Sequence, residues 1–258
     1  MSQKKALVAA LITGAGILGV STLAFAEVPG FYAGAQIGYG MQDLNNPNLQ
    51  PLLESNLTAV SSTNASNTKS GAAGGIYGGF QFNDYFAAEL GYIHFPNASF
   101  NNSVTGFNTL GMSTVNSSTL TSTENAIDIM LKGMIPFGGG FGGYAKIGGA
   151  YVFNKFTISL NGVSSNPTAT NFQNISGNGT NDQFKPIGAV GLTYDFNDNV
   201  VMDLSYTYLF GSSGNSTSSS NLVNNLNNLS NVNIGVPKAG MVALGITYYF
   251  TGGGTDDP

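Results

Sequence analysis

The sequence predicts an all-β protein, an eight-stranded antiparallel up-and-down transmembrane β-barrel. Three observations predict it: side chains alternate with a period of two in eight segments, long and short connections alternate, and charged residues are scarce. They make up 8% of the 258 residues, against roughly 25% in soluble domains. With so few charges a water-facing surface would be poorly soluble, so we expect a surface that faces lipid.

The last predicted strand, 240–250, shows what the pattern requires. Its bulky side chains share one face: Val242, Leu244, Ile246, Tyr248 and Phe250. The residues between them are mostly small, and this period of two is that of a strand. Such a strand needs apolar surroundings on its bulky side, which are either a protein core or lipid.

Seven more segments have the same period: 31–40, 71–82, 85–95, 125–137, 141–156, 184–196 and 200–210. Turns at 83–84, 138–140 and 197–199 alternate with long polar stretches at 41–70, 97–124, 157–183 and 211–237, which we interpret as loops. Long loops on one side and short turns on the other are typical of outer-membrane barrels. Ten residues at ~3.3 Å each, tilted by ~40°, span about 25 Å, which matches the apolar band of such barrels.

The ends of the chain and its composition add the compartment. Residues 1–26 have the pattern of a secretory signal peptide, with Lys4 and Lys5, an apolar stretch and an A-x-A cleavage site at 24–26. We therefore expect a removed signal at 1–26, a barrel at 27–250 and a short periplasmic tail at 251–258. The chain has no Cys, which excludes thiolate metal sites, and no Arg, which argues against nucleic acid. We expect no metal and no cofactor.

Charged residues on the inward parity form the main candidate site. They are Glu89, Asp128, Lys132, Lys146, Asp195 and Asp203. All but Asp128 lie within about five residues of the short turns, so we expect them in one layer, with Glu89 paired to Lys132 and Lys146 paired to Asp195. An internal network that plugs the barrel is the first interpretation, because eight strands leave little lumen, and a gated ion path is the alternative.

Other features point away from catalysis. His94 is the only histidine, and Ser99, five residues away, lies beyond Pro96 with no acidic residue to orient the pair. We expect His94 at the membrane interface. Two G-x-G-x-x-G segments, 14–19 and 138–143, lack the strand-to-helix context of a nucleotide site. Aromatic girdles are expected at both interfaces, the outer one with Tyr39, Tyr92, Phe95 and Tyr208 and the inner one with Phe31, Phe86, Phe137, Phe196 and Phe250.

Several short segments resemble the OmpA-like outer-membrane barrel family: Gly30-Phe31-Tyr32-Ala33-Gly34, Glu89-Leu90-Gly91-Tyr92 and Leu204-Ser205-Tyr206. The resemblance covers about residues 27–250. It implies an assembly signal at Gly245, Tyr248 and Phe250, which the barrel assembly machinery would recognise. The chain departs from that signal at Ala243, and Phe250 is followed by eight more residues. A peptidoglycan-binding domain is therefore not expected.

From the pattern and the resemblance together we expect a monomeric, non-enzymatic, surface-exposed protein of the Gram-negative outer membrane. Its partners would be membrane lipid and lipopolysaccharide, with a host or phage ligand at the long loops. Two alternatives remain open, a narrow porin-like channel for ions or small solutes and an adhesin. A lipid-modifying enzyme that uses His94 is a third.

Overall fold

The computed structural model describes residues 30–43, 53–54, 57–108, 110–164, 175–211 and 237–250. The predicted signal peptide, the predicted tail and nearly all of the predicted loop 211–237 lie outside these residues. The strands are β1 (Gly30–Asp43), β2 (Ala59–Thr68), β3 (Ser70–Asn83), β4 (Phe86–His94), β5 (Ala98–Phe107), β6 (Ser113–Gly138), β7 (Phe141–Ser164), β8 (Ile175–Asn197), β9 (Val200–Leu209) and β10 (Lys238–Tyr249).

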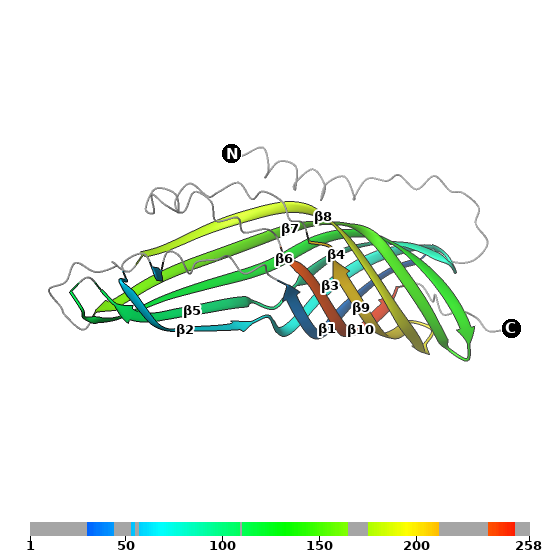
Figure 1. Ribbon diagram of the computed structural model, residues 1–258. Helices are drawn as coiled ribbons and strands as arrows, with labels where there is room; N and C mark the ends of the chain where they lie inside the picture. The colour runs from blue at the N-terminus through cyan, green and yellow to red at the C-terminus, as the bar shows by residue number, and fades with distance from the viewer. Residues whose placement is uncertain are drawn as a thin grey trace, which may run out of the picture.

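Eight of these strands close into a ring, in the order β1-β3-β4-β6-β7-β8-β9-β10 (Figure 1). Every neighbouring pair is antiparallel, and β10 pairs with β1 over twelve positions from Tyr32–Tyr249 to Asp43–Lys238. The predicted eight-stranded up-and-down barrel is therefore confirmed.

Three of the four predicted loops, 41–70, 97–124 and 157–183, are wrong in large part. Many of their residues form strands of a sheet that extends beyond the barrel (Figure 1). β2 pairs with β5, β5 pairs with the first half of β6, and the long strands β7 and β8 continue the sheet. We call this part the extension: β2, β5, and residues 113–124 of β6, 155–164 of β7 and 175–183 of β8. The segments read as loops because one face of each strand is Ser, Thr and Asn, which hides the period of two.

The extension has a small apolar core of its own. Inward side chains of its strands form an almost fully buried cluster with Leu53, which comes from the short segment 53–54. The members from the strands are Phe100, Val104, Leu120, Phe156, Ile158 and Leu160. Asn116 Nδ2 donates a hydrogen bond of 2.7 Å to the Leu53 carbonyl oxygen, which ties the short segment 53–54 to β6. Burial of several large side chains stabilises a sheet that would otherwise be two-sided and polar.

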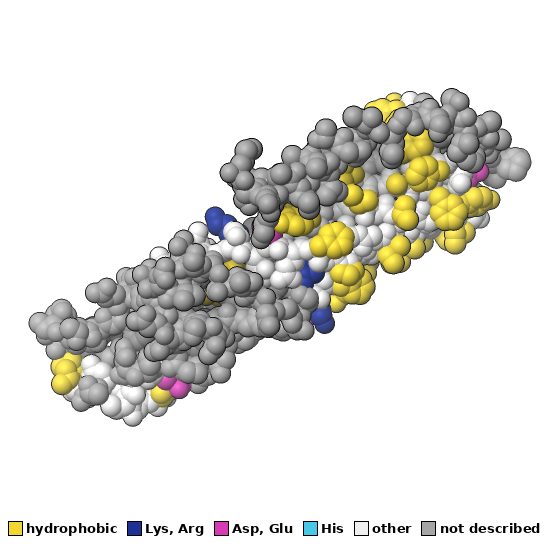
Figure 2. Space-filling view, turned by 90° about the horizontal axis from the view of Figure 1, so that it is seen from above, with side chains coloured by type: hydrophobic (Ala, Val, Ile, Leu, Met, Phe, Trp, Pro, Cys, Tyr) yellow, Lys and Arg dark blue, Asp and Glu magenta, His cyan; other side chains and the backbone are white. Residues whose placement is uncertain are grey.

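The outside of the ring carries the apolar residues that the alternation predicts. Leu244 is 61% exposed and Ile147 is 74% exposed, and Figure 2 shows hydrophobic side chains gathered over one end of the molecule. Monomers in water rarely expose so large a continuous apolar surface, so this band faces lipid. Among the described residues no helix is long and apolar enough to cross a membrane.

The aromatic residues at the turn end lie as predicted, but one at the other end does not. Phe31, Phe86, Phe137, Phe196 and Phe250 all point outward and are at least 60% exposed. Phe95, predicted in the outer girdle, is fully buried. It shares the parity of inward Glu89 and Ile93, so its ring enters the barrel.

Asparagines and glycines fix the short turns that set the strand register. Asn83 Oδ1 accepts hydrogen bonds from the backbone N–H groups of Tyr85 and Phe86, both at 2.9 Å. Asn197 Oδ1 does the same for Asn199 and Val200, at 3.0 and 2.9 Å. The turn between β6 and β7 uses three glycines with positive φ, at residues 138–140, a conformation that other residues rarely adopt.

Candidate functional site

A network of charged and tyrosine side chains crosses the interior of the barrel near its turn end. We call it the lumen network: Tyr32, Tyr77, Glu89, Lys132, Tyr144, Lys146, Asp203 and Thr247. These residues come from seven of the eight ring strands, β8 being the exception. Because inward side chains of an eight-stranded barrel meet near its axis, residues far apart in sequence come into contact.

Glu89 is the first centre of the network and is 2% exposed. Its carboxylate lies 3.5 Å from Lys132 Nζ and 2.5 Å from Lys146 Nζ. The Tyr32 hydroxyl donates a third contact to Oε1, at 2.8 Å. Three charged or polar partners satisfy a carboxylate that would be costly to bury alone.

Asp203 is the second centre. The Tyr144 hydroxyl donates to Asp203 Oδ2 at 2.9 Å, and the Tyr77 hydroxyl lies 3.4 Å from Oδ1. Tyr77 also bonds to Thr247 Oγ1 at 2.7 Å, which reaches β10. The two centres are therefore joined to strands on opposite sides of the ring.

The tyrosine rings also hold the lysines. Lys132 Nζ lies 4.8 Å from the centre of the Tyr144 ring, and Lys146 Nζ lies 4.8 Å from the same ring centre. An ammonium over an aromatic face is attracted by the ring quadrupole. Two carboxylates and two ammonium groups give the network a formal charge of zero, so it is an electrically balanced layer across the lumen.

The structure brings together some of the predicted residues and not others. Glu89 and Lys132 lie within ion-pair distance. The predicted pairing of Lys146 with Asp195 is wrong, because Lys146 is opposite Ala189 in the β7–β8 register and Asp195 lies six residues farther along β8. The expected single layer therefore does not include Asp195.

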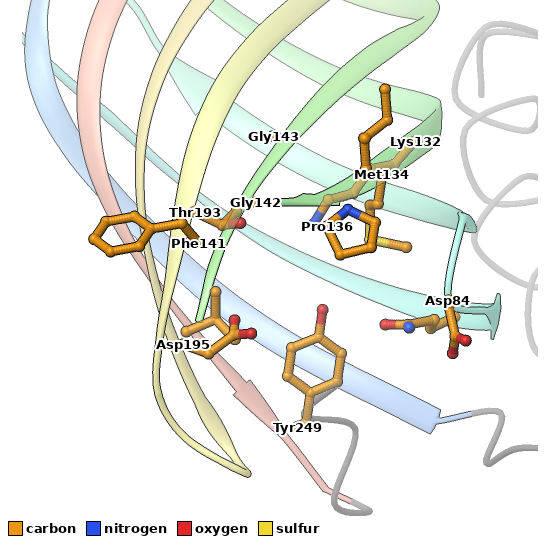
Figure 3. A pocket seen from close by; sticks show the side chains of 13 residues that line it. Asp84, Lys132, Met134, Pro136, Phe141, Gly142, Gly143, Thr193, Asp195 and Tyr249 are labelled. Atoms are coloured by element: carbon orange, nitrogen blue, oxygen red, sulfur yellow. The ribbon is translucent and has the colours of Figure 1, made fainter. Parts of the chain in front are cut away.

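Asp195 instead lines a small pocket at the turn end of the barrel, of about 60 Å³. Figure 3 shows it with Asp84, Lys132, Thr193 and Tyr249, so that these five residues come from three different strands and a turn. Lys132 thus contacts both the lumen network and this opening. The pocket is too small for a drug-sized ligand, for which about 300 Å³ is the usual minimum.

Asp128 lies on the other side of the network, toward the extension. It is 1% exposed, and neither carboxylate oxygen has a hydrogen-bond partner. Its side chain lies over Gly91, where a Cβ would be within 2.8 Å of Oδ2. Asp128 is therefore next to the network without belonging to it.

An apolar layer surrounds Asp128, which lies between Met130 and Ala126 on the inward parity of β6. Its members are buried inward side chains: Ala73, Ile93, Phe95, Ala126, Met130, Ala150, Val152, Ile187, Leu209, Ala239, Met241 and Ala243. Along β6, Met130 and Ala126 follow Lys132 on the inward parity, so this layer lies between the lumen network and the extension. The described part of the lumen is thus closed twice, first by paired charges and then by packed apolar side chains.

Inward glycines make room for the tyrosine rings of the lumen network, which the sequence analysis did not predict. A Cβ on Gly79 would overlap the Tyr32 ring, one on Gly34 the Tyr77 ring, and one on Gly191 the Tyr144 ring. The signal was present as tyrosine and glycine on the inward parity of neighbouring strands, but their cross-strand register cannot be read from one sequence.

The predicted assembly-signal residues lie on β10 and just after it. Tyr248 and Phe250 point outward, 50% and 62% exposed, with ring centres 5.6 Å apart. Gly245 points inward, and a Cβ there would overlap the Asp203 carboxylate. Glycine at position 245 therefore also leaves space for Asp203, the second centre of the lumen network.

His94 lies at the edge of the apolar band, as expected. Its Nδ1 is 2.7 Å from Asn125 Oδ1, and the Tyr92 hydroxyl donates to the same oxygen at 2.9 Å. Ser99 is on the following strand, opposite Thr121. In the part of the chain that the structure describes, no group of three or more His, Asp or Glu side chains could hold a metal ion.

The closed ring with its outward apolar band defines a transmembrane β-barrel. The chain belongs to the OmpA-like transmembrane domain family, which matches residues 26–254. A protein of Coxiella burnetii described as uncharacterized is 26% identical over 268 residues, covering 96% of this chain and 99% of the relative.

Solved structures of outer-membrane proteins are similar at low identity. Ail, the attachment invasion locus protein of Yersinia pestis, crystallised with the heparin analogue sucrose octasulfate, is 12% identical with a TM-score of 0.37, covering 86% of this chain and 99% of Ail. Neisserial surface protein A is 13% identical with a TM-score of 0.38, over 87% and 100% of the two chains. OprG from Pseudomonas aeruginosa is 15% identical with a TM-score of 0.39, over 85% and 96%.

Proposed function

We propose that this chain is a closed, surface-exposed barrel of the Gram-negative outer membrane with a structural role, and that it is neither a channel nor an enzyme. The observation that carries the proposal is the ion pair of Glu89 with both Lys132 and Lys146 inside the barrel. An ion could pass only by displacing these pairs. The apolar layer beyond them would then have to admit water, which packed apolar constrictions resist.

Solute exchange across vesicles tests this proposal. Vesicles that contain the refolded mature chain should swell no faster in small sugars than vesicles without protein. Glu89→Ala removes the carboxylate that both ammonium groups contact but leaves the apolar layer in place, so the leak should rise only when it is combined with Phe95→Ala, which opens that layer as well. Asp43→Ala is the matched control, because its ion pair with Lys69 is largely exposed and lies outside the lumen network. Rapid swelling with the unmodified chain would support the porin-like alternative.

The proposed partners follow from this placement. The apolar band would contact membrane lipid and lipopolysaccharide, and Gly245, Tyr248 and Phe250 would be recognised by the barrel assembly machinery. We place any host or phage ligand on the side of the extension. The family membership and the outward aromatic residues support the placement.

An adhesin is a second candidate, and the extension favours it. Five strands with a buried core project past the apolar band, which gives a rigid surface beyond the membrane. Deleting 98–122, and separately 212–236, should then abolish attachment of expressing bacteria to host cells while the barrel still folds. Unchanged attachment by both variants would contradict this candidate.

A non-enzymatic role is proposed for His94. Its Nδ1 is engaged by an amide oxygen rather than a carboxylate, so within the described part of the chain it lacks the acidic partner that orients a catalytic-triad histidine. His94→Ala should leave the lipid profile of the outer membrane unchanged. A changed profile would favour the lipid-modifying enzyme.

A further inference from the structure

The outer face of the extension is an ordered array of hydroxyl and amide side chains. Its members, which we call the hydroxyl face, are Ser62, Asn64, Ser66, Thr68, Ser99, Asn101, Ser103, Thr105, Ser117, Thr119, Thr121, Thr123, Lys155, Thr157, Ser159, Asn161, Ser176, Asn178 and Thr180. None of them is buried. Lys155 is the only charged residue in the set.

The strand register arranges these side chains in rows. Thr68, Ser99, Thr121, Thr157 and Asn178 stand side by side across five strands. The next row is Ser66, Asn101, Thr119, Ser159 and Ser176. With strands about 4.8 Å apart and alternate residues about 6.8 Å apart, the face is a lattice about 20 Å in each direction.

The hydroxyl face is the direct continuation of the lipid-facing band. On β6 the outward residues run from Ile129 and Ile127 through Asn125 to Thr123 and Thr121, without a change of parity. Figure 2 shows most of the hydrophobic side chains that are visible on this face gathered toward one end of the molecule. Whatever covers the hydroxyl face is therefore the layer next to the acyl chains of the leaflet.

The chemistry of the face selects among the components of that layer. Acyl chains and apolar protein surfaces are a poor match, because the face carries hydroxyl and amide groups, and the exposed apolar residues of the same parity, Phe107 and Val115, lie at the ends of β5 and β6 far from the barrel. Phosphate groups are a poor match because one Lys is its only cation and backbone amides are used in the sheet. Sugar hydroxyls are a good match, since Ser, Thr and Asn offer both donors and acceptors.

Resting on the proposed outer-membrane placement, we propose that the hydroxyl face binds the core saccharide of neighbouring lipopolysaccharide in the outer leaflet. The sugars would lie along the rows and exchange hydrogen bonds with the hydroxyl and amide groups. Thr119 Oγ1 already donates to Asn101 Oδ1 at 2.9 Å, so at least one neighbouring pair is pre-ordered. The extension would then hold the barrel in its saccharide layer.

Single-cysteine labelling tests the proposal, because the chain contains no cysteine. Thr157→Cys and Ser159→Cys place a nitroxide on the hydroxyl face, and Asp198→Cys places one in the short turn at the other end of the barrel. Each mature variant is inserted into vesicles of phospholipid alone, with added lipid A, or with added lipopolysaccharide that carries its core saccharide. Accessibility to a water-soluble relaxation agent is then measured.

The expected result is a several-fold loss of accessibility at 157 and 159 only with the core saccharide, and no change at 198. Equal protection by lipid A would assign the contact to the lipid A headgroup and not to the core saccharide, and would overturn the proposal. No protection in any membrane would show a merely solvated face and would overturn it too. Heat-modifiable mobility on gels verifies barrel insertion separately, so a chain that fails to insert contradicts the proposed function and not this contact.

Discussion

Lys132 on β6 lies directly opposite Lys146 on β7, and both ammonium groups contact the same carboxylate, that of Glu89 on β4. Two like charges on adjacent strands would repel strongly in a buried site. The Glu89 carboxylate offsets that repulsion, and the Tyr144 ring attracts both ammonium groups, each 4.8 Å from its centre. The two lysines thus share one contacting carboxylate.

Replacing that acid should cost more than any surface ion pair. Glu89→Gln leaves two buried lysines without the carboxylate that both contact, and we expect a loss of about 3–5 kcal/mol in the free energy of unfolding. Urea titration of the refolded barrel in vesicles measures it. The control Asp43→Asn breaks the exposed pair with Lys69 and should cost about 0–1 kcal/mol. Equal effects of the two changes would show that the lumen network does not stabilise the barrel.

The space that inward glycines leave for the tyrosine rings can be tested with two adjacent residues of β3. Gly79→Ala should push the Tyr32 ring away from Glu89 and destabilise the barrel by about 1–3 kcal/mol. Gly78→Ala faces lipid, where a Cβ meets its nearest atom, the Tyr32 carbonyl oxygen, at an ordinary 3.7 Å. It should be neutral or slightly stabilising. The same urea titration compares the two variants. Equal stability would show that the Tyr32 ring does not need the space beside Gly79.

Phe250 should matter for assembly and not for stability. Phe250→Ala should reduce the amount of barrel inserted in the outer membrane of expressing cells, whereas Phe196→Ala should not. Both rings point outward at the turn end, 62% and 69% exposed, so the two variants lose similar lipid contact. Normal insertion of Phe250→Ala would show that the assembly-signal interpretation is wrong.

The extension should unfold independently of the barrel. Leu120→Ala creates a cavity in the extension core and should cost about 2–5 kcal/mol there, which exposes 98–122 to protease while the barrel fragment survives. Val115→Ala, on the same strand but 41% exposed, should remain resistant. Cleavage of both variants at the same rate would mean that the cluster around Leu120 does not hold the extension.

The ring was predictable because its strands carry large apolar residues on one parity, as in Val242 to Phe250. The extension was not, because Thr119 and Thr121 flank Leu120 and a strand with one polar face and few large side chains looks like a loop. Ile158 and Leu160 kept the period of two inside a predicted loop and were the available signal.

For the site, parity identified the inward charges but not their partners. Lys146 binds Glu89 rather than Asp195 because pairing depends on register, and the register places Lys146 opposite Lys132 on β6 and opposite Ala189 on β8. The role of Tyr32 and Tyr144 could not be predicted in this way, because it depends on the glycines that the register places opposite them on neighbouring strands.

The most direct test of the closed barrel is the electrical conductance of planar bilayers that contain the refolded mature chain. We predict no steady conductance above that of the bare bilayer, and discrete openings only when Glu89→Ala, which removes the shared carboxylate, is combined with Phe95→Ala, which opens the apolar layer. A steady conductance of the unmodified chain that is lost in Lys132→Ala or Lys146→Ala would contradict this prediction, because those lysines would then line an ion path.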